Sequence, residues 1–184
     1  MNLLSIIIPT YLRHNFLKKK IDELVTIENQ FENIETIFII EPEDISTNQL
    51  INNSNLKNFK VIYNTGPHHH SFDIGANHSS GKYLVFMGDD DYFVKDQFRK
   101  VIKILENYKN EWIISGANYV SGEGKVIRKL ISKIKFFLLR NYNKEVLSVL
   151  NFVMTPSVIV RRDIYFKFDG FETKYEYAQD FYLW

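Results

Sequence analysis

Short apolar runs alternate with longer segments of mixed apolar and polar residues along this 184-residue chain. Each apolar run ends at turn-forming residues, which is typical of a buried strand. In the longer segments the apolar residues recur every three or four positions, which indicates amphipathic helices. The pattern predicts strands at residues 4–8, 36–40, 59–63, 83–87, 112–115 and 157–160, and helices at residues 16–31, 49–58, 71–79 and 96–108.

This alternation predicts an α/β fold, a mainly parallel sheet with helices on both faces. In open sheets of this kind, ligands bind beyond the carboxyl ends of the strands. Polar loops follow three of the predicted strands, at residues 9–11, 41–47 and 88–91. If those strands are neighbours, the three loops meet along one edge of the sheet, and we expect the ligand there.

The composition is that of an ordinary globular domain, with 45% hydrophobic residues, 24% charged residues and a net charge of +1. So small a net charge gives no reason to expect nucleic acid as a partner. The absence of cysteine excludes disulfides and thiolate zinc sites. Since the sequence shows neither a signal peptide nor a long apolar run, we expect a cytoplasmic protein, with the inner face of the membrane as a further option.

Three consecutive carboxylates, Asp89, Asp90 and Asp91, directly follow a predicted buried strand. Adjacent carboxylates repel one another and raise each other's pKa, so a compensating cation is expected. Carboxylate oxygens suit Mg²⁺ or Mn²⁺, which also bind substrate phosphates. The alternative is a solvated turn that caps the helix beginning near Asp96, because acidic residues favour helix N-termini.

Four motifs occur in a fixed order along the chain. They are SIIIPTY at residues 5–11 followed by Arg13, the spaced residues Asn64, Gly66, Gly75, Gly81 and Tyr83 leading into GDDD at residues 88–91, FDGFE at residues 168–172, and YAQDFYLW at residues 177–184. This series resembles glycosyltransferase family 2, which has the GT-A fold, with a Rossmann-like nucleotide-binding core. The resemblance runs from the first strand to the last residue.

The resemblance implies one GT-A domain, in which residues 1–116 bind a nucleotide sugar and residues 117–184 form an incomplete acceptor-side half. It implies inverting transfer of a sugar from a nucleotide-diphosphate sugar to a hydroxyl of a saccharide or lipid-linked acceptor, in the assembly of surface polysaccharide, lipopolysaccharide or capsule. The implied cofactor is Mn²⁺ or Mg²⁺, bound by Asp89 and Asp91. The implied nucleotide-sugar-binding residues are Pro9, Thr10, Tyr11, Arg13, Glu41, Glu43, Asp44, Asn64, Gly66, Asp73, Asp89 and Asp90.

After the second strand, the chain departs from the family pattern. Family members often have Asp-Asp-Gly-Ser there, with one Asp in contact with the nucleotide base. Here either Glu41 or the pair Glu43 and Asp44 takes that place, so the base remains open.

The metal motif can also be matched in two ways. If the last two Asp residues of the family motif are matched to Asp90 and Asp91, then Gly88 stands at the motif's first Asp. If the D-x-D pattern is matched literally, its two Asp residues are Asp89 and Asp91.

By the same resemblance, Asp180 is the candidate base. It would accept the proton of the acceptor hydroxyl during a single in-line displacement at the anomeric carbon. The metal and nearby donors would stabilise the departing nucleoside diphosphate. Gln179 precedes Asp180 where the family often has Glu. The alternative is that Asp180 is an exposed helix residue with no such role.

The run His68-His69-His70 admits two interpretations. Consecutive residues cannot easily direct three imidazoles at one ion, and metal sites usually space their ligands apart. A polar loop near the diphosphate is therefore favoured over a metal site.

The segment from Lys125 to Lys144 holds seven basic residues and no acidic one, with Ile131, Ile134 and Phe136 to Leu139 among them. A basic amphipathic helix can lie on an anionic membrane surface. An ordinary surface helix with a buried apolar side is the alternative.

Two other functions fit parts of this pattern. A sugar-phosphate nucleotidyltransferase would need a glycine-rich phosphate loop near the N-terminus, but residues 9–13 contain no glycine. An inactive nucleotide-sugar-binding remnant is the second, because family members normally continue beyond the position of Trp184.

Overall fold

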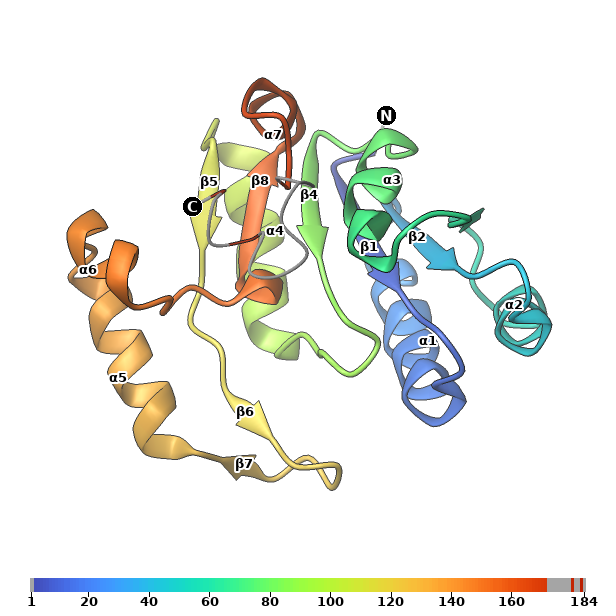
Figure 1. The fold of residues 1–184 in the computed structure, drawn as a ribbon, viewed down its shortest axis with the longest axis horizontal. Helices are drawn as coiled ribbons and strands as arrows, with labels where there is room; N and C mark the ends of the chain where they lie inside the picture. Colours follow the sequence, from blue (N-terminus) through green and yellow to red (C-terminus); the bar gives the residue numbers. More distant parts are fainter. Residues whose placement is uncertain (1, 172–179, 181–182, 184) are drawn as a thin grey trace.

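The computed structural model describes residues 2–171, 180 and 183. Its main sheet has six strands in the order β3-β2-β1-β4-β8-β5 (Figure 1). The strands are β1 (Leu4–Pro9), β2 (Ile34–Ile40), β3 (Phe59–Tyr63), β4 (Tyr83–Phe86), β5 (Trp112–Ile114) and β8 (Val158–Arg161). The first four run parallel, while β8 is antiparallel to both of its neighbours, β4 and β5. The predicted mainly parallel sheet is therefore confirmed.

Helices cover both faces of this sheet, as the alternating pattern predicts. One face packs against α1 (His14–Glu28), α2 (Ile45–Asn52) and α4 (Lys95–Asn107). The other packs against α3 (Ser71–Asn77) and α7 (Arg162–Lys167). Side chains alternate between the faces of a strand, so Ile6 and Ile8 of β1 meet α1, whereas Ile7 faces α3. Strands buried on both faces read as continuous apolar runs, which explains the short runs in the sequence.

The second predicted helix, at residues 49–58, overlaps the observed helix α2 only at residues 49–52. Helix α2 begins at Ile45 because Asp44 caps it, its carboxylate accepting a hydrogen bond from the Thr47 N–H at 3.0 Å. An N-cap of this kind satisfies one of the free N–H groups at the start of a helix. The helix ends at Asn52, so the predicted start is four residues too late and the predicted end six residues too late.

Gly81 marks the closest approach of two backbones near the start of β4. A Cβ atom at this position would lie 2.6 Å from the Ser5 nitrogen and 2.9 Å from the Leu4 carbonyl carbon. The Gly81 N–H donates to the Ser5 hydroxyl and to the Glu35 carboxylate. Glycine at this position therefore lets β4 enter the sheet beside β1.

A separate group of elements stands between β5 and β8. It comprises the strands β6 (Tyr119–Val120) and β7 (Val126–Ile127), which form a two-stranded ribbon, and the helices α5 (Lys129–Arg140) and α6 (Lys144–Val149). Short 3₁₀ turns occur at η1 (His68–His70) and η2 (Thr155–Ser157). The ribbon and α5 extend to one side of the main sheet (Figure 1). The described helices include none with the length and apolar character that a membrane span requires.

Candidate functional site

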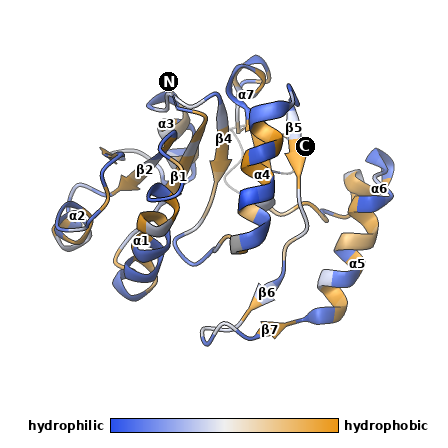
Figure 2. Ribbon diagram, turned by 180° about the vertical axis from the view of Figure 1, so that it is seen from behind, coloured by the Kyte–Doolittle hydropathy of each residue, from blue (hydrophilic) through white to orange (hydrophobic). Residues whose placement is uncertain are grey.

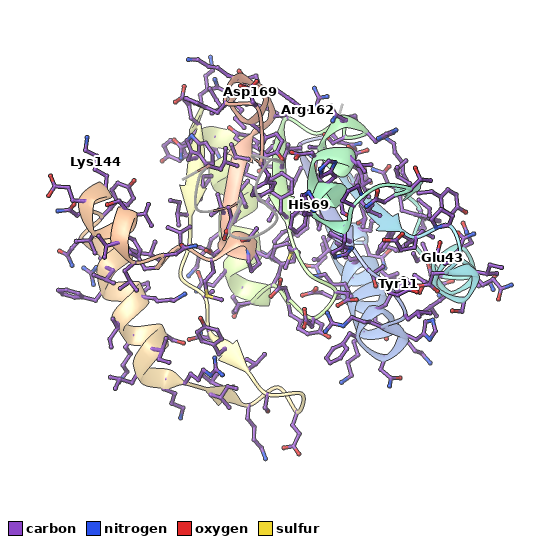
Figure 3. The ribbon with its side chains drawn as sticks, viewed as in Figure 1. Tyr11, Glu43, His69, Lys144, Arg162 and Asp169 are labelled. Carbon is purple, nitrogen blue, oxygen red and sulfur yellow. The ribbon has the colours of Figure 1, made fainter. Side chains whose placement is uncertain are left out.

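The loops after β1 and β2 and the loop after β4 meet at one edge of the sheet, as the sequence predicts. They surround a pocket of about 390 Å³, a volume within the range of small-molecule sites. Tyr11 and Glu43 lie near each other at this edge, beside α2 (Figure 3). The pocket is lined by Pro9, Thr10, Tyr11, Arg13, Glu41, Glu43, His68 and Asp89.

Arg13 and Thr10 hold the carboxylates of the acidic loop, which we define as residues 88–93. Asp89 is buried, and its Oδ2 accepts a hydrogen bond from the Thr10 hydroxyl at 2.7 Å, while Oδ1 lies 2.8 Å from Arg13 Nη1. The other guanidinium nitrogen, Nη2, donates to Asp90 Oδ2 at 2.6 Å. A planar guanidinium suits such a two-carboxylate contact. Arg13 therefore supplies part of the positive charge that the acidic triplet needs.

The third carboxylate, that of Asp91, is bound by the backbone of its own loop. The Gly88 N–H donates to Asp91 Oδ2 at 2.8 Å. Burial raises the pKa of Asp91, and this hydrogen bond opposes the rise. Burial also raises the pKa of Asp89, against the hydrogen bond from Thr10 and the charge of Arg13. A raised pKa means that the protein's own groups stabilise the ionised form incompletely.

These carboxylates fit one mode of divalent-cation binding. Within residues 2–171, 180 and 183, no three His, Cys, Asp or Glu side chains converge on a common point. Mg²⁺ sites in phosphate-handling enzymes commonly use only one or two carboxylates and complete the coordination with substrate phosphates and water. Asp89 in the pocket wall and Asp91 two residues later supply carboxylates that burial leaves incompletely compensated. They suit a cation shared with a diphosphate better than one held by the protein alone.

In the loop after β2, the sequence left open whether Glu41 or the pair Glu43 and Asp44 contacts the nucleotide base. The structure places these side chains differently. Glu41 and Glu43 both line the pocket, and His68 Nδ1 lies 4.0 Å from Glu41 Oε1. Asp44 is 2% exposed, and its carboxylate accepts from the backbone N–H groups of Leu12 and Thr47. Asp44 thus holds the start of α2 against the loop after β1, and the two glutamates face the ligand space.

Asn64 and Gly66 shape the turn that carries His68 and do not line the pocket. The Asn64 side-chain amide donates to the Pro67 carbonyl and the Ser71 hydroxyl, and its oxygen accepts from the Gly66 N–H. Asn64 is 1% exposed. Its contribution to the site is therefore to place the loop that holds His68.

Asp73 lies on α3 and binds both α7 and the segment after it. Its Oδ1 accepts hydrogen bonds from the Tyr165 hydroxyl and, at 3.2 Å, from the Phe171 N–H. Burial raises the pKa of Asp73, although both hydrogen bonds oppose the rise. Gly170 has a positive φ of 69°, which lets the chain turn close to Asp73 and Tyr165. Asp73 joins two elements on the face of the sheet opposite α1.

Asp180 lies beside the 3₁₀ turn that precedes β8. The Thr155 hydroxyl donates to Asp180 Oδ2 at 2.8 Å. Much of the surrounding motif, residues 172–179, 181, 182 and 184, falls outside the described residues, and Gln179 is among them. Thr155 had no place in the sequence analysis, because a hydroxyl 25 positions from an aspartate gives no local signal.

Sequence reasoning also missed Lys20 and Glu23 on α1. Lys20 is fully buried, and its Nζ donates to Glu23 Oε2 and to the Asp91 carbonyl, each at 2.8 Å. Burial lowers the pKa of Lys20, and the neighbouring Glu23 carboxylate opposes that shift. The available signal was the position of Lys20, three residues after Leu17 on the apolar stripe of the helix.

A Rossmann-like sheet with an acidic loop beyond β4, and a pocket of hydroxyl, guanidinium and carboxylate groups, defines a GT-A-type domain. The chain belongs to glycosyl transferase family 2, whose model matches residues 5–166. An uncharacterized glycosyltransferase of Haemophilus influenzae is 28% identical over 160 residues, which cover 82% of this chain and 62% of the relative. One from Rickettsia bellii is 30% identical over 134 residues, covering 70% of this chain and 19% of the relative. The chain thus spans less than two thirds of the length of these relatives.

Solved structures share the fold at low sequence identity. S. aureus TarS 1-349 in complex with UDP superposes with a TM-score of 0.68 at 16% identity, covering 98% of this chain and 53% of TarS 1-349. The same protein also matches in complex with UDP-GlcNAc. The mannosyltransferase PcManGT from Pyrobaculum calidifontis, in complex with GDP-Man and Mn²⁺, gives 0.66 at 13% identity, covering 98% of this chain and 50% of PcManGT. These similarities confirm the fold.

Proposed function

We propose that this chain is the nucleotide-sugar-binding part of a metal-dependent inverting glycosyltransferase, which moves a sugar from a nucleotide-diphosphate sugar to a hydroxyl acceptor. The observation that carries the proposal is the pocket beyond β1 and β2. Five of its eight lining residues, Pro9, Thr10, Tyr11, Arg13 and Asp89, belong to the motifs that resemble the family. Asp89 of the acidic triplet lies in its wall, in contact with Thr10 and Arg13 of the first motif.

The charges around this pocket suggest how a donor would lie. Glu41 and Glu43 can accept hydrogen bonds from the N–H groups of a base or the hydroxyls of a ribose. Arg13 can donate to phosphate oxygens as readily as to carboxylates. His68 belongs to the same wall, so the histidine loop lies near the donor, as a polar loop rather than a metal site.

A divalent cation would be held by Asp89 and Asp91 together with the diphosphate, where it would stabilise the charge of the departing nucleoside diphosphate. Mn²⁺ or Mg²⁺ suits these oxygen ligands. The complex of PcManGT with GDP-Man and Mn²⁺ supports this choice by analogy of fold. The complexes of TarS with UDP and UDP-GlcNAc support the donor class in the same way.

On the acceptor side, we assign the base to Asp180. An in-line displacement with inversion needs a base on the side of the anomeric carbon opposite to the leaving diphosphate, and so from a segment other than the acidic loop. A carboxylate can accept the hydroxyl proton as the new bond forms. The hydrogen bond from Thr155 would orient Asp180 for this role. Residues 1–116 would then serve the donor and residues 117–184 the acceptor, which we take to be a saccharide or a lipid-linked sugar of a surface polysaccharide.

We further propose that helix α5 contacts an anionic membrane surface on the cytoplasmic side, where a lipid-linked acceptor would lie. Leu130 is 71% exposed and Phe137 65%, and Ile134 is exposed on the same side of the helix. Basic side chains flank these apolar groups along α5. Figure 2 shows the alternation of apolar and polar stretches on this helix. An exposed apolar stripe between basic residues is the pattern of a helix that lies in a lipid headgroup region.

Donor binding is tested by thermal shift and isothermal titration with UDP, GDP and their sugar derivatives, with Mn²⁺ and with EDTA. A ligand at a hundredfold excess over its Kd stabilises by roughly 2.7 kcal/mol. Asp91→Asn should weaken Mn²⁺-dependent nucleotide binding by tenfold or more, about 1.4 kcal/mol. Asp22→Asn, which alters an exposed carboxylate on α1, is the matched control and should bind normally. Binding that survives both EDTA and Asp91→Asn would contradict the metal assignment.

A further inference from the structure

Lys20 occupies a position on α1 at which an apolar residue would ordinarily stand. Leu17, Ile21 and Leu24 on the same face are buried in the core. Lys20 is 0% exposed, and its Nζ has three acceptors around it, Glu23 Oε2, the Asp91 carbonyl oxygen and, at 3.7 Å, the Met87 sulfur. An ammonium carries three N–H donors, so each has an acceptor. Such a saturated arrangement indicates a specific role for the buried charge.

Burial of this charge is unfavourable by itself. An ammonium loses its hydration when it is buried, and the attraction of its partner offsets that loss only in part. A methionine or leucine would fill the space between α1 and β4 without this penalty. What an apolar residue cannot do is donate a hydrogen bond to the backbone of the acidic loop.

Glu23, one turn further along α1, makes the second contact with that loop. Its Oε1 accepts a hydrogen bond from the Phe93 N–H at 2.7 Å, while its Oε2 binds Lys20. The two side chains thus hold the Asp91 carbonyl and the Phe93 N–H, which lie on either side of Tyr92. The rings of Tyr92 and Phe93 also lie within 5.6 Å and 5.0 Å of Lys20 Nζ.

Helix α1 therefore contacts the acidic loop at two levels. Arg13, directly before the helix, binds the carboxylates of Asp89 and Asp90. Lys20, seven residues later and so two turns along the same face, binds the backbone after them. The side chain of Asp91 is fixed from within the loop by the Gly88 N–H, so its direction depends on how the loop backbone is held.

We infer that the buried Lys20–Glu23 pair is a positioning device that fixes the backbone of residues 91–93 and thereby aims Asp91 at the cation shared with the donor diphosphate. The consequence for the cation rests on the proposed function, whereas the restraint of the loop does not. Partners that orient a metal ligand without touching the metal typically change metal affinity by roughly 10- to 100-fold when they are removed.

The test compares Lys20→Met and Glu23→Gln with Lys19→Met, an exposed lysine on the same helix. Methionine keeps the apolar stem and removes the donors, and glutamine leaves one oxygen to serve two donors. The first readout is amide hydrogen exchange in the metal-free protein. Both variants should exchange at least tenfold faster than wild type at residues 91–93, with unchanged exchange in β1, β2 and β4. The control should match wild type throughout.

The second readout is the affinity for Mn²⁺ alone, followed by electron paramagnetic resonance. Each variant should bind Mn²⁺ about tenfold more weakly, while the control keeps the wild-type value. Unchanged exchange at residues 91–93 in both variants would overturn the inference. So would faster exchange with unchanged Mn²⁺ affinity, or faster exchange across the whole sheet, which would mark a purely structural role. If wild type itself binds no Mn²⁺, the metal assignment of the proposed function fails, and the exchange data alone decide whether the pair restrains the loop.

Discussion

Two regions of this molecule use apolar residues in opposite ways. Around β1, β2 and β4, the apolar side chains are buried on both faces of the sheet, and polar groups at the strand ends are held by specific partners. In the segment from residue 115 to residue 157, α5 buries only Ser132, while Leu130 and Phe137 are among the more exposed apolar residues. Figure 3 places Lys144, the first residue of α6 in this segment, on the opposite side of the molecule from Tyr11.

The difference shows what each region requires from its surroundings. A ligand site needs groups fixed to within a fraction of an ångström, and a packed core provides that rigidity. An apolar stripe that remains exposed is instead favourable only when another apolar phase covers it. The first region therefore buries its apolar side chains within the described residues, whereas the second leaves an apolar stripe exposed on α5 beside a small core of Leu147, Phe152 and Val153.

The largest effect is expected at Asp180, whose carboxylate accepts a hydrogen bond from Thr155 of the second region. Asp180→Asn should slow sugar transfer by roughly 10²–10⁴-fold, the usual contribution of a general base. Donor affinity should hardly change, because the base would contact the acceptor. Both kcat and the donor Kd are measured for Asp180→Asn and for wild type, in an active form of the protein. Near-normal turnover would remove Asp180 from the mechanism, and a parallel loss of donor binding would indicate a structural role.

A pair of phenylalanine substitutions compares the two regions directly. Phe38 of β2 is 0% exposed, so Phe38→Ala should lower the free energy of unfolding by about 3–5 kcal/mol. The melting temperature should fall by on the order of 10 °C for a domain of this size. Phe137→Ala on α5 should change stability by less than about 0.5 kcal/mol. Equal losses in urea unfolding would show that α5 is packed in solution and would contradict the contrast.

The basic residues of α5 allow the two regions to be compared by their contribution to membrane binding. Replacing Lys129, Lys133 and Arg140 by Gln should weaken partition onto anionic vesicles by roughly a hundredfold, since each basic group contributes about 1 kcal/mol near such a surface. Replacing the exposed Lys18, Lys19 and Lys100 in the same way is the matched control. Vesicle sedimentation at low and high salt measures both. If wild type sediments equally with neutral and anionic vesicles, or only self-associates, the membrane proposal fails.

The smallest effect concerns Asp73 in the buried region. Burial raises its pKa in the folded state, so the folded protein binds its proton more readily than the unfolded chain does. The free energy of unfolding should therefore fall as pH rises from about 4, the ordinary value for Asp, through the raised value. Asp73→Asn should flatten this slope. Urea unfolding at several pH values between 4 and 7 measures it, and an unchanged slope would show that other groups carry the dependence.

Much of the fold could be predicted because its signals are local. Residues 4–8 and 36–40 are apolar runs closed by proline or a charged residue, and both became central strands. Helix α2 was misplaced because its cap is a tertiary feature as well as a local one. Asp44 binds Leu12 from the loop after β1 as well as Thr47 of its own helix.

The candidate site, like the fold, could be predicted from the sequence only in part. The predicted strand ends placed the loops that carry Thr10, Glu41 and Asp89 at one edge of the sheet, and in the structure these residues line one pocket with Arg13. The expectation that a cation compensates the acidic triplet was incomplete, because Arg13 supplies part of that charge. Neither the choice of Glu41 and Glu43 over Asp44 as pocket residues nor the use of Asp73 to bind Tyr165 follows from any local pattern.

The sequence by itself determined the class of fold, the strands that carry the pocket and most of its lining, because hydrophobic periodicity and motif spacing act over a few residues. Only the tertiary structure decided which polar groups meet. Lys20 and Asp91 are 71 positions apart and become neighbours because β1 and β4 pair and α1 packs beside them. Pairing of strands and packing of helices are properties of the whole chain, so the contacts that they create have no counterpart in any short segment.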